Sequence, residues 1–366
     1  MVKFILRKAL ETKHLIPILA LIVFLATKAL GNVGFGFSIL ATLFLGISIM
    51  ASVHHAEIIA HKIGEGLGTL VLALSVTIIE VGLILSLMGQ GGEEASILAR
   101  DTVFAAVMIV TNGIVALCLI LGGLKFKEQE FQVHGSKSLF VVLIALSFLV
   151  FVLPNFTISS PGGTYSAYQM AYIAGALLVL YVLFVIFQTR THKSYFEPTV
   201  GALKPEEEKS HDDVSATDAW LSFLSLCVSL VAVIGLAKIL SPTIERAVVA
   251  LGAPKSVVGL LIALIVLLPE SWAAVISARA NRLQTSLNLA LGSGIASIAL
   301  TIPFVIVFSL VNGTPLTLGL DGKGLAFMLM TFAVGTLTLG TGKSTLLQGA
   351  VHGIILLTYF VMAFIP

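Results

Sequence analysis

The chain has 366 residues, of which 57% are apolar and only 11% are charged. A soluble domain carries roughly 25% charged residues, so this chain cannot cover a water-facing surface and needs a lipid bilayer as part of its solvent. Its 21 basic and 19 acidic residues nearly balance, which excludes the basic stripe of a nucleic-acid-binding protein.

Apolar runs bounded by charged residues, Gly or Pro predict the membrane spans. A bilayer core about 30 Å thick requires about 20 apolar residues per helix. Eleven runs meet or approach that length: 15–30, 36–53, 67–88, 102–122, 138–153, 168–187, 220–239, 257–277, 287–310, 325–339 and 345–365. The sequence therefore predicts an all-α polytopic membrane protein with about eleven transmembrane helices.

The basic residues are distributed unevenly over the predicted loops. With the N-terminus in the cytoplasm, fifteen Lys and Arg residues lie inside and six lie outside. Cytoplasmic loops carry an excess of basic residues in membrane proteins. We therefore expect a cytoplasmic N-terminus and an external C-terminus.

Two of the predicted spans carry a carboxylate near their middle. Glu80 is the fourteenth residue of the run 67–88, and Glu270 is the fourteenth residue of the run 257–277. A carboxylate inside a bilayer is costly and therefore indicates function. The alternative is a pair of structural acids, protonated or hydrogen-bonded to neighbouring helices, but two acids at the same depth are hard to explain by packing.

The same two spans indicate an internal repeat. Sliding the sequence on itself by 190 positions aligns Glu80 with Glu270, and the two spans run in opposite directions in the predicted topology, as an inverted repeat requires. The longest polar stretch separates the halves. The predicted parts are an N-terminal tail with one extra helix over 1–35, a first five-helix repeat over 36–187, an acidic cytoplasmic linker over 188–219 and a second five-helix repeat over 220–366.

Each carboxylate has a helix-weakening residue beside it. Pro269 removes a backbone donor just before Glu270, and Gly82 follows Glu80. Spans interrupted at matching places in two halves are typical of a transporter binding site at the midplane of the membrane. We therefore expect both spans to be interrupted near their carboxylates.

The chemistry of two facing carboxylates is that of an exchanger. In a low-dielectric site they cannot both stay ionised without a counter-charge. They become neutral either by binding a cation or by taking up protons, and these two outcomes exclude each other. Oxygen ligands favour a hard cation such as Ca²⁺. Side chains expected to assist Glu80 and Glu270 are Thr77, Asn112, Ser271 and Ser293.

Two further groups of polar residues leave alternatives open. A polar cluster follows the run 36–53 and consists of His54, His55, Glu57, His61 and Glu65. It forms either a solvated loop or, because His titrates near neutrality, an ion-access funnel, a gate or a pH sensor. Ser297 is also assigned to gating, although ordinary helix packing beside Gly292 and Gly294 would explain both Ser293 and Ser297.

These residues resemble a known family. The stretch from His61 to Glu80, HKIGEGLGTLVLALSVTIIE, is similar to the first repeat of the calcium/cation antiporter superfamily, and most similar to the bacterial Cha-type calcium (sodium, potassium)/proton antiporters. The second repeat matches through Leu267–Ser271 and Asn288–Gly294. The resemblance implies exchange of Ca²⁺, Na⁺ or K⁺ for H⁺ in the inner (plasma) membrane, without a cofactor.

The expected partners are inorganic cations, protons and the lipid bilayer, and a homo-oligomer is compatible with the sequence. A cation channel or an uncoupled cation carrier is the main alternative, although channels ordinarily build carboxylate rings by oligomerisation. A membrane-embedded enzyme is a weaker alternative, because it needs a nucleophile with a base, or His-rich metal ligands, inside the spans. We therefore expect a transporter and not an enzyme.

Overall fold

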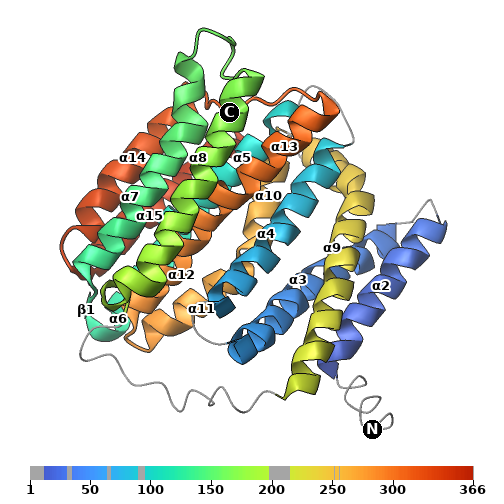
Figure 1. Ribbon diagram of the computed structural model, residues 1–366, viewed down its shortest axis with the longest axis horizontal. Helices are drawn as coiled ribbons and strands as arrows, with labels where there is room; N and C mark the ends of the chain where they lie inside the picture. The colour runs from blue at the N-terminus through green and yellow to red at the C-terminus, as the bar shows by residue number, and fades with distance from the viewer. Residues whose placement is uncertain are drawn as a thin grey trace. The chain divides into compact units, whose positions relative to one another are not determined.

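The computed structural model describes residues 12–30, 35–63, 67–89, 95–197, 215–250, 252–254 and 256–365. Glu65 and most of the predicted acidic linker lie outside these ranges. The chain forms two compact units, 1–90 with 205–252 (unit 1) and 91–204 with 253–366 (unit 2). Each unit contains helices from both predicted repeats (Figure 1).

The fold is helical and suited to a membrane. In the described ranges, eight helices are long and apolar enough to cross a bilayer, or nine if one bent pair counts as a single span. The prediction of an all-α polytopic membrane protein is confirmed, whereas the number of eleven spans stays a prediction. Large apolar side chains on the outer helices are exposed, for example Leu347 and Leu357, as expected of side chains that face lipid.

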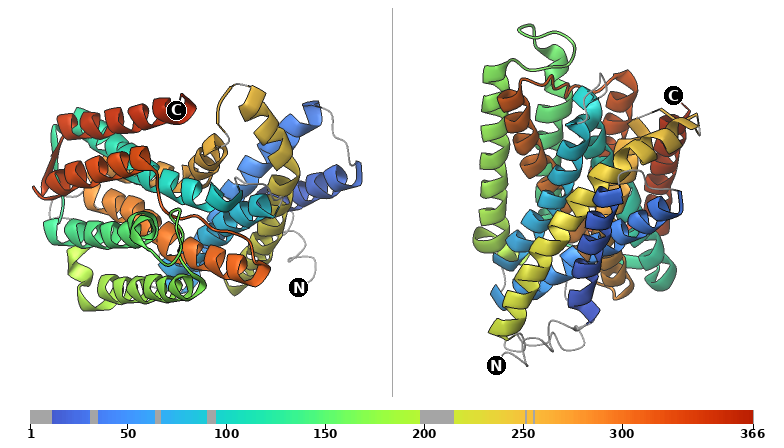
Figure 2. Two further views of the ribbon diagram at one scale, coloured as in Figure 1. Left: turned by 90° about the horizontal axis from the view of Figure 1, so that it is seen from above. Right: turned by 90° about the vertical axis from the view of Figure 1, so that its right-hand side faces the viewer.

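Unit 1 is a group of four helices. They are α2 (Thr12–Leu30), α3 (Phe35–Ile63), α4 (Leu67–Met88) and α9 (Ala216–Ala250). Helix α9 packs against the other three (Figures 1 and 2). Ala56 and Ile59 on α3 form a buried cluster with Leu226 on α9.

Unit 2 holds the remaining elements. In chain order they are α5 (Ala95–Ile109), η1 (Val110–Ile114), α6 (Val115–Phe126), β1 (Glu128–Glu130), α7 (Val133–Ser147), η2 (Phe148–Val152), η3 (Leu153–Phe156), α8 (Ala167–Ile186), η4 (Phe187–Thr191), η5 (Lys193–Tyr195), α10 (Ser256–Val266), α11 (Leu268–Arg279), α12 (Leu283–Ala296), η7 (Ser297–Thr301), α13 (Ile302–Asn312), α14 (Gly322–Leu339), β2 (Lys343–Thr345) and α15 (Leu346–Phe364). Its core is the continuous rod α5–η1–α6, which packs against α10, α11, α12, α14 and α15.

Packing inside unit 2 is duplicated in the way that an inverted repeat predicts. Helix α15 packs against η1 and α6, and its predicted counterpart α8 packs against η7 and α13. The π-helical turns η1 and η7 lie in the third span of each predicted repeat, and each packs against the other span, η1 against α12 and η7 against α5. These pairs support the two repeats independently of the glutamates.

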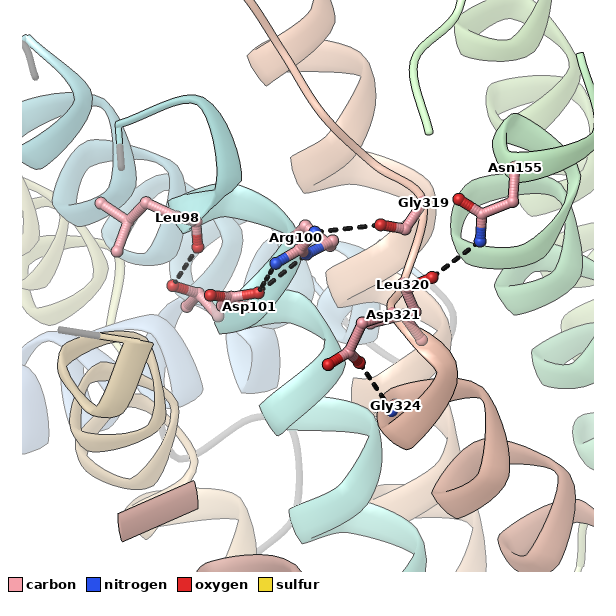
Figure 3. A network of polar contacts seen from close by, with 9 residues as sticks. Leu98, Arg100, Asp101, Asn155, Gly319, Leu320, Asp321 and Gly324 are labelled. Atoms are coloured by element: carbon pink, nitrogen blue, oxygen red, sulfur yellow. Dashed lines mark hydrogen bonds and ion pairs between the residues drawn. The ribbon is translucent and has the colours of Figure 1, made fainter. Parts of the chain in front are cut away.

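Unit 2 has two ends, and the loops that meet at each end are those that the predicted topology places on one side of the membrane. At one end β1 and β2 form an antiparallel pair, and the Gln129 side chain donates to the carbonyl of Ala278 at 2.8 Å. At the other end Arg100 donates to the carbonyl of Gly319 at 3.0 Å, and Asn155 donates to that of Leu320 at 2.7 Å (Figure 3). This grouping of the loops agrees with the predicted alternation of spans, and the side on which each end lies stays a prediction.

Candidate cation-binding site

Glu270 lies at a break between two helices. Helices α10 and α11 are bent by 53°, and Pro269 cannot donate the hydrogen bond that an unbroken helix would form to the carbonyl of Ile265. Glu270 is half-buried in the first turn of α11, where the partial positive charge of a helix N-terminus stabilises an anion. The predicted interruption of this span is confirmed.

Ser271 belongs to the same break. Its hydroxyl donates to the carbonyl of Leu267 at 2.6 Å, and its backbone N–H donates to the same oxygen at 2.9 Å. These two hydrogen bonds connect Ser271, the residue after Glu270, to Leu267 at the bend. Whether its oxygen also contacts a cation stays a prediction.

Glu80 lies on an unbroken helix, so the expected interruption of α4 is wrong. Helix α4 runs without a break past Glu80 and Gly82, because a glycine keeps its backbone donor while a proline loses it. Glu80 and Thr77 are both buried and lie three residues apart on one face of α4. Gly82 instead makes room for α9, since a Cβ atom there would lie 2.5 Å from Cγ1 of Ile234.

Asn112 lies in the π-helical turn η1, where all five residues are buried. Single π-turns inside α-helices are frequent at functional sites. Its amide Nδ2 donates to Oγ1 of Thr331 on α14 at 2.8 Å. Its Oδ1 accepts from Nδ1 of His352 on α15 at 2.8 Å. The turn therefore directs Asn112 into a buried polar network, which we call the Asn112 network.

The Asn112 network has three further members that the sequence reasoning did not assign to the site, Thr331, Thr338 and His352. Oγ1 of Thr338 lies 3.1 Å from Nε2 of His352, and Oγ1 of Thr331 donates to the sulfur of Met108 at 3.5 Å. All three are buried. His352 carried a usable signal, because it is the single histidine inside the eleven apolar runs, whereas nothing in sequence distinguishes Thr331 from other span threonines.

The predicted residues Ser293 and Ser297 lie on α12, which packs against η1, and on η7, which packs against α5. Ser297 is buried in η7, and Ser293 is half-buried one turn earlier. The expectation that glycines permit close approach holds for Gly294, where a Cβ atom would lie 3.4 Å from Cγ1 of Val110 in η1. It does not hold for Gly292, beside which no neighbouring atom lies within 4 Å of such a Cβ.

The polar group that follows the run 36–53 is part of a helix, so the solvated-loop interpretation is wrong for its described residues. Helix α3 extends to Ile63, and its period divides the group between two faces. Glu57 and His61 are exposed, whereas His55 is fully buried. The His55 ring donates through Nε2 to the carbonyl of Lys13 on α2 at 3.0 Å. Glu65 lies outside the described residues.

Packing in unit 2 gathers most of the predicted site. The turn η1 contacts α11, α12, α14 and α15, which carry Glu270 and Ser271, Ser293, Thr331 and His352 respectively. Glu80 and Thr77 belong to unit 1. Unit 2 alone thus offers one carboxylate, one amide and several hydroxyl groups from elements that pack together, a set of oxygen ligands suited to a hard cation.

Comparison with known proteins matches the chain over most of its length. A family model described as sodium/calcium exchanger protein matches residues 33–190 and 221–365, and the gap between these ranges falls in the predicted linker. The protein y4hA of Sinorhizobium fredii is 45% identical over 87% of this chain and 86% of its own length. The sodium-potassium/proton antiporter ChaA of Escherichia coli is 32% identical over 97% of this chain and 96% of its own.

Solved structures show the same fold. Native YfkE is 16% identical, with a TM-score of 0.72 over 97% of this chain and 100% of that one. The H⁺/Ca²⁺ exchanger CAX is 15% identical, with a TM-score of 0.67 over 93% of this chain and 86% of that one. The architecture is therefore that of helical membrane exchangers.

Proposed function

The chain belongs to the sodium/calcium exchanger family, and from this premise we propose that it exchanges an inorganic cation for protons across the membrane. The relatives that support this are named as antiporters, among them the sodium-potassium/proton antiporter ChaA of Escherichia coli and the Ca²⁺/H⁺ antiporter ChaA of Bacillus subtilis. The proposed site of exchange is the pair Glu80 and Glu270.

The observation that carries the proposal is the placement of Glu270. Its carboxylate stands at a helix N-terminus inside a broken span, behind a proline that fixes the break. A bilayer leaves irregular backbone only where protein or a water-filled cavity surrounds it, so such a break indicates a binding site. Glu80, buried on α4, supplies the second carboxylate, and alternate neutralisation by cation and proton couples the two fluxes.

Glu80 and Glu270 would bind the cation together with Thr77, Asn112, Ser271 and Ser293. We propose Ca²⁺ as a substrate, with Na⁺ and K⁺ as further substrates. Two features favour the monovalent ions besides Ca²⁺. The relative at 32% identity is named for sodium and potassium, and Val76 and Leu267 contribute no side-chain oxygen near the two glutamates. We also propose the inner membrane as the location, with the N-terminus in the cytoplasm.

The test uses everted membrane vesicles with an acid-inside pH gradient and a pH-sensitive dye. Adding Ca²⁺, Na⁺ or K⁺ to vesicles with the wild-type protein should restore dye fluorescence. Glu80→Gln and Glu270→Gln should each reduce exchange at least about 100-fold, because a buried site then lacks one charge partner. Glu130→Gln, an exposed carboxylate of β1, is the matched control and should retain exchange.

Near-normal exchange by either buried-site variant would contradict the two-glutamate mechanism. A channel would be recognised by a different pattern. Cation flux would then proceed without a pH gradient, and adding a cation would not move protons. Insertion of every variant is checked by its amount in the membrane fraction, so a lost signal is not confused with lost protein.

A further inference from the structure

His352 is a buried titratable residue that the two-glutamate mechanism does not use. Its side chain is 1% exposed, and both ring nitrogens have partners. Nδ1 lies 2.8 Å from Oδ1 of Asn112, and Nε2 lies 3.1 Å from Oγ1 of Thr338. A polar group this deeply buried is expected to serve a specific contact, because leaving it unpaired is expensive.

The Asn112 amide, whose nitrogen faces Thr331 and whose oxygen faces the His352 ring, determines which ring nitrogen carries the proton. An amide oxygen can only accept a hydrogen bond, so His352 must donate through Nδ1 to Asn112. In a neutral imidazole Nε2 is then an acceptor, and the Thr338 hydroxyl donates to it. The tautomer is thus set by the Asn112 side, and the Thr338 hydroxyl adjusts to it by rotation.

With the proton on Nδ1, this contact in turn stabilises the orientation of the Asn112 amide. Turning the amide over would place its NH₂ group against the Nδ1–H of His352, which sets donor against donor. Thr331 opposes such a turn only weakly, because its hydroxyl can leave the sulfur of Met108 and donate to the amide oxygen instead. His352 is therefore the member of the Asn112 network that holds the amide oxygen in place. An amide oxygen has two lone pairs, so one that accepts from His352 has a second with which it would bind a cation.

We propose that His352 is a positioning residue: by donating Nδ1–H to Oδ1 of Asn112, it orients the amide in the cation site and so sets the affinity for the transported cation. This inference rests on the proposed cation exchange. It does not make His352 a cation ligand or a carrier of the transported proton. Its effect passes through Asn112.

Two substitutions separate the two ring nitrogens. Asparagine places an amide nitrogen where histidine has Nδ1, so His352→Asn keeps the donor to Asn112 and loses the contact with Thr338. Glutamine places its amide where histidine has Nε2, so His352→Gln keeps the contact with Thr338 and loses the donor to Asn112. Thr358→Val, on an exposed position of the same helix with its hydroxyl bonded to Ile354, is the matched control.

The cation concentration that gives half-maximal exchange is measured for the full-length variants in reconstituted vesicles, across pH 7–9. We expect His352→Asn and Thr358→Val to remain within about twofold of wild type with the same pH profile. His352→Gln should raise the half-maximal concentration about tenfold, the effect of one lost buried hydrogen bond. Equal behaviour of the two His352 variants, whether both normal or both impaired, would overturn the proposal.

A second readout does not require transport. Cation-dependent thermal stabilisation of the same proteins in detergent reports binding alone, and His352→Gln should need about tenfold more cation for the same stabilisation. If wild type binds a cation without exchanging it, the proposed function fails while this comparison still decides the role of His352. Nitrogen NMR of labelled histidine, with the His352 signal assigned by its loss in His352→Asn, should show the proton on Nδ1. A proton on Nε2 would overturn the proposal.

Discussion

Helix α4 and the helix pair α10–α11 carry the two glutamates of the predicted repeats, yet their backbones differ. Helix α4 is continuous around Glu80, whereas α10 and α11 are bent by 53° just before Glu270. Glu80 therefore lies in the middle of a helix, where every neighbouring peptide group has a helical partner. Glu270 lies in the first turn of a helix, where the partial positive charge of the helix N-terminus favours an anion.

Carboxylates at matching positions of two repeats therefore do not imply that the backbones around them match. A glycine weakens a helix by roughly 1 kcal/mol but keeps its N–H, while a proline costs roughly 3 kcal/mol and removes a hydrogen bond. Inside a bilayer an unmade backbone hydrogen bond costs several kcal/mol. The chain next to Gly82 therefore stays helical, and only the chain at Pro269 breaks. The two glutamates therefore have different backbone surroundings, because Glu270 lies at a helix end and Glu80 lies on a helix face.

The largest expected effect comes from removing the cause of the bend. Pro269→Ala restores a backbone donor, so α10 and α11 can join into one helix and carry Glu270 away from its position. A displacement of about 1 Å costs on the order of 100-fold in enzyme sites, and we expect cation/proton exchange to fall at least tenfold. The unfolding temperature in detergent should hold or rise, because a helix former replaces a helix breaker.

Exchange at the wild-type rate in Pro269→Ala would show that the bend between α10 and α11 has no role in function. The matched control is Pro303→Ala. Pro303 lies inside the continuous span 283–312, directly after the π-helical turn η7, and the span is not broken there. This substitution should leave exchange within about twofold of wild type, because it removes no bend.

The second prediction concerns the glycine of the bent pair. A Cβ atom at Gly259 on α10 would lie 3.0 Å from the backbone nitrogen of Thr102 and 3.3 Å from the carbonyl carbon of Asp101 on α5. Backbone atoms cannot move aside, so α10 would have to separate from α5. We expect Gly259→Ala to lower the free energy of unfolding by about 3 kcal/mol, the upper end for overpacking. Denaturation followed by circular dichroism in detergent measures this loss.

Gly175→Ala is its control, because a Cβ atom there meets no neighbouring atom within 4 Å. It should be neutral or slightly stabilising, since alanine favours a helix by up to about 1 kcal/mol. Equal stability of the two variants would show that α10 and α5 are not held at the distance described.

The helical fold could be predicted from the apolar runs. The errors in the predicted helix boundaries lie where helices continue beyond those runs. The run 36–53 ended too early, because α3 continues to Ile63 with Glu57 and His61 on its exposed face. A helix with one polar face is indistinguishable from a loop when residues are read one after another. The buried position of His55 on the other face follows from the helical period, which a search for continuous apolar runs does not use.

Of the candidate site, only the polar residues in the middle of the spans were predictable from the sequence. Glu80, Glu270 and Asn112 could be found because a polar group at mid-span is rare. The partners of Asn112 could not, since His352 is 240 positions away and only the packing of α15 on η1 brings it close. The π-helical form of η1 has no known composition signal in the sequence VTNGI. Tertiary packing decides both features, so they could be read only from the structure.

The smallest expected effect concerns Gly82 on α4. A Cβ atom at Gly82 would lie 2.5 Å from Cγ1 and 2.6 Å from Cδ1 of Ile234, but this neighbour is a side chain that can change rotamer. Gly82→Ala gains up to about 1 kcal/mol of helix propensity and loses roughly 1–3 kcal/mol by overpacking. We expect a net loss of about 1 kcal/mol in the free energy of unfolding, less than for Gly259→Ala.

Gly82→Ala paired with Ile234→Ala tests whether that contact is the cause. Alanine at position 234 removes both Cγ1 and Cδ1 and leaves only Cβ, 3.7 Å from the new methyl group, so the loss caused by Gly82→Ala should largely vanish relative to Ile234→Ala alone, a coupling that a double-mutant cycle measures directly. If Gly82 instead served to interrupt α4, the Ile234 substitution would not reduce the effect of Gly82→Ala. Exchange would then be lost even where the free energy of unfolding is nearly unchanged. Recovery of both stability and exchange would establish that Gly82 is a packing residue, and that of the two glutamate-bearing spans only the one with Pro269 depends on a break.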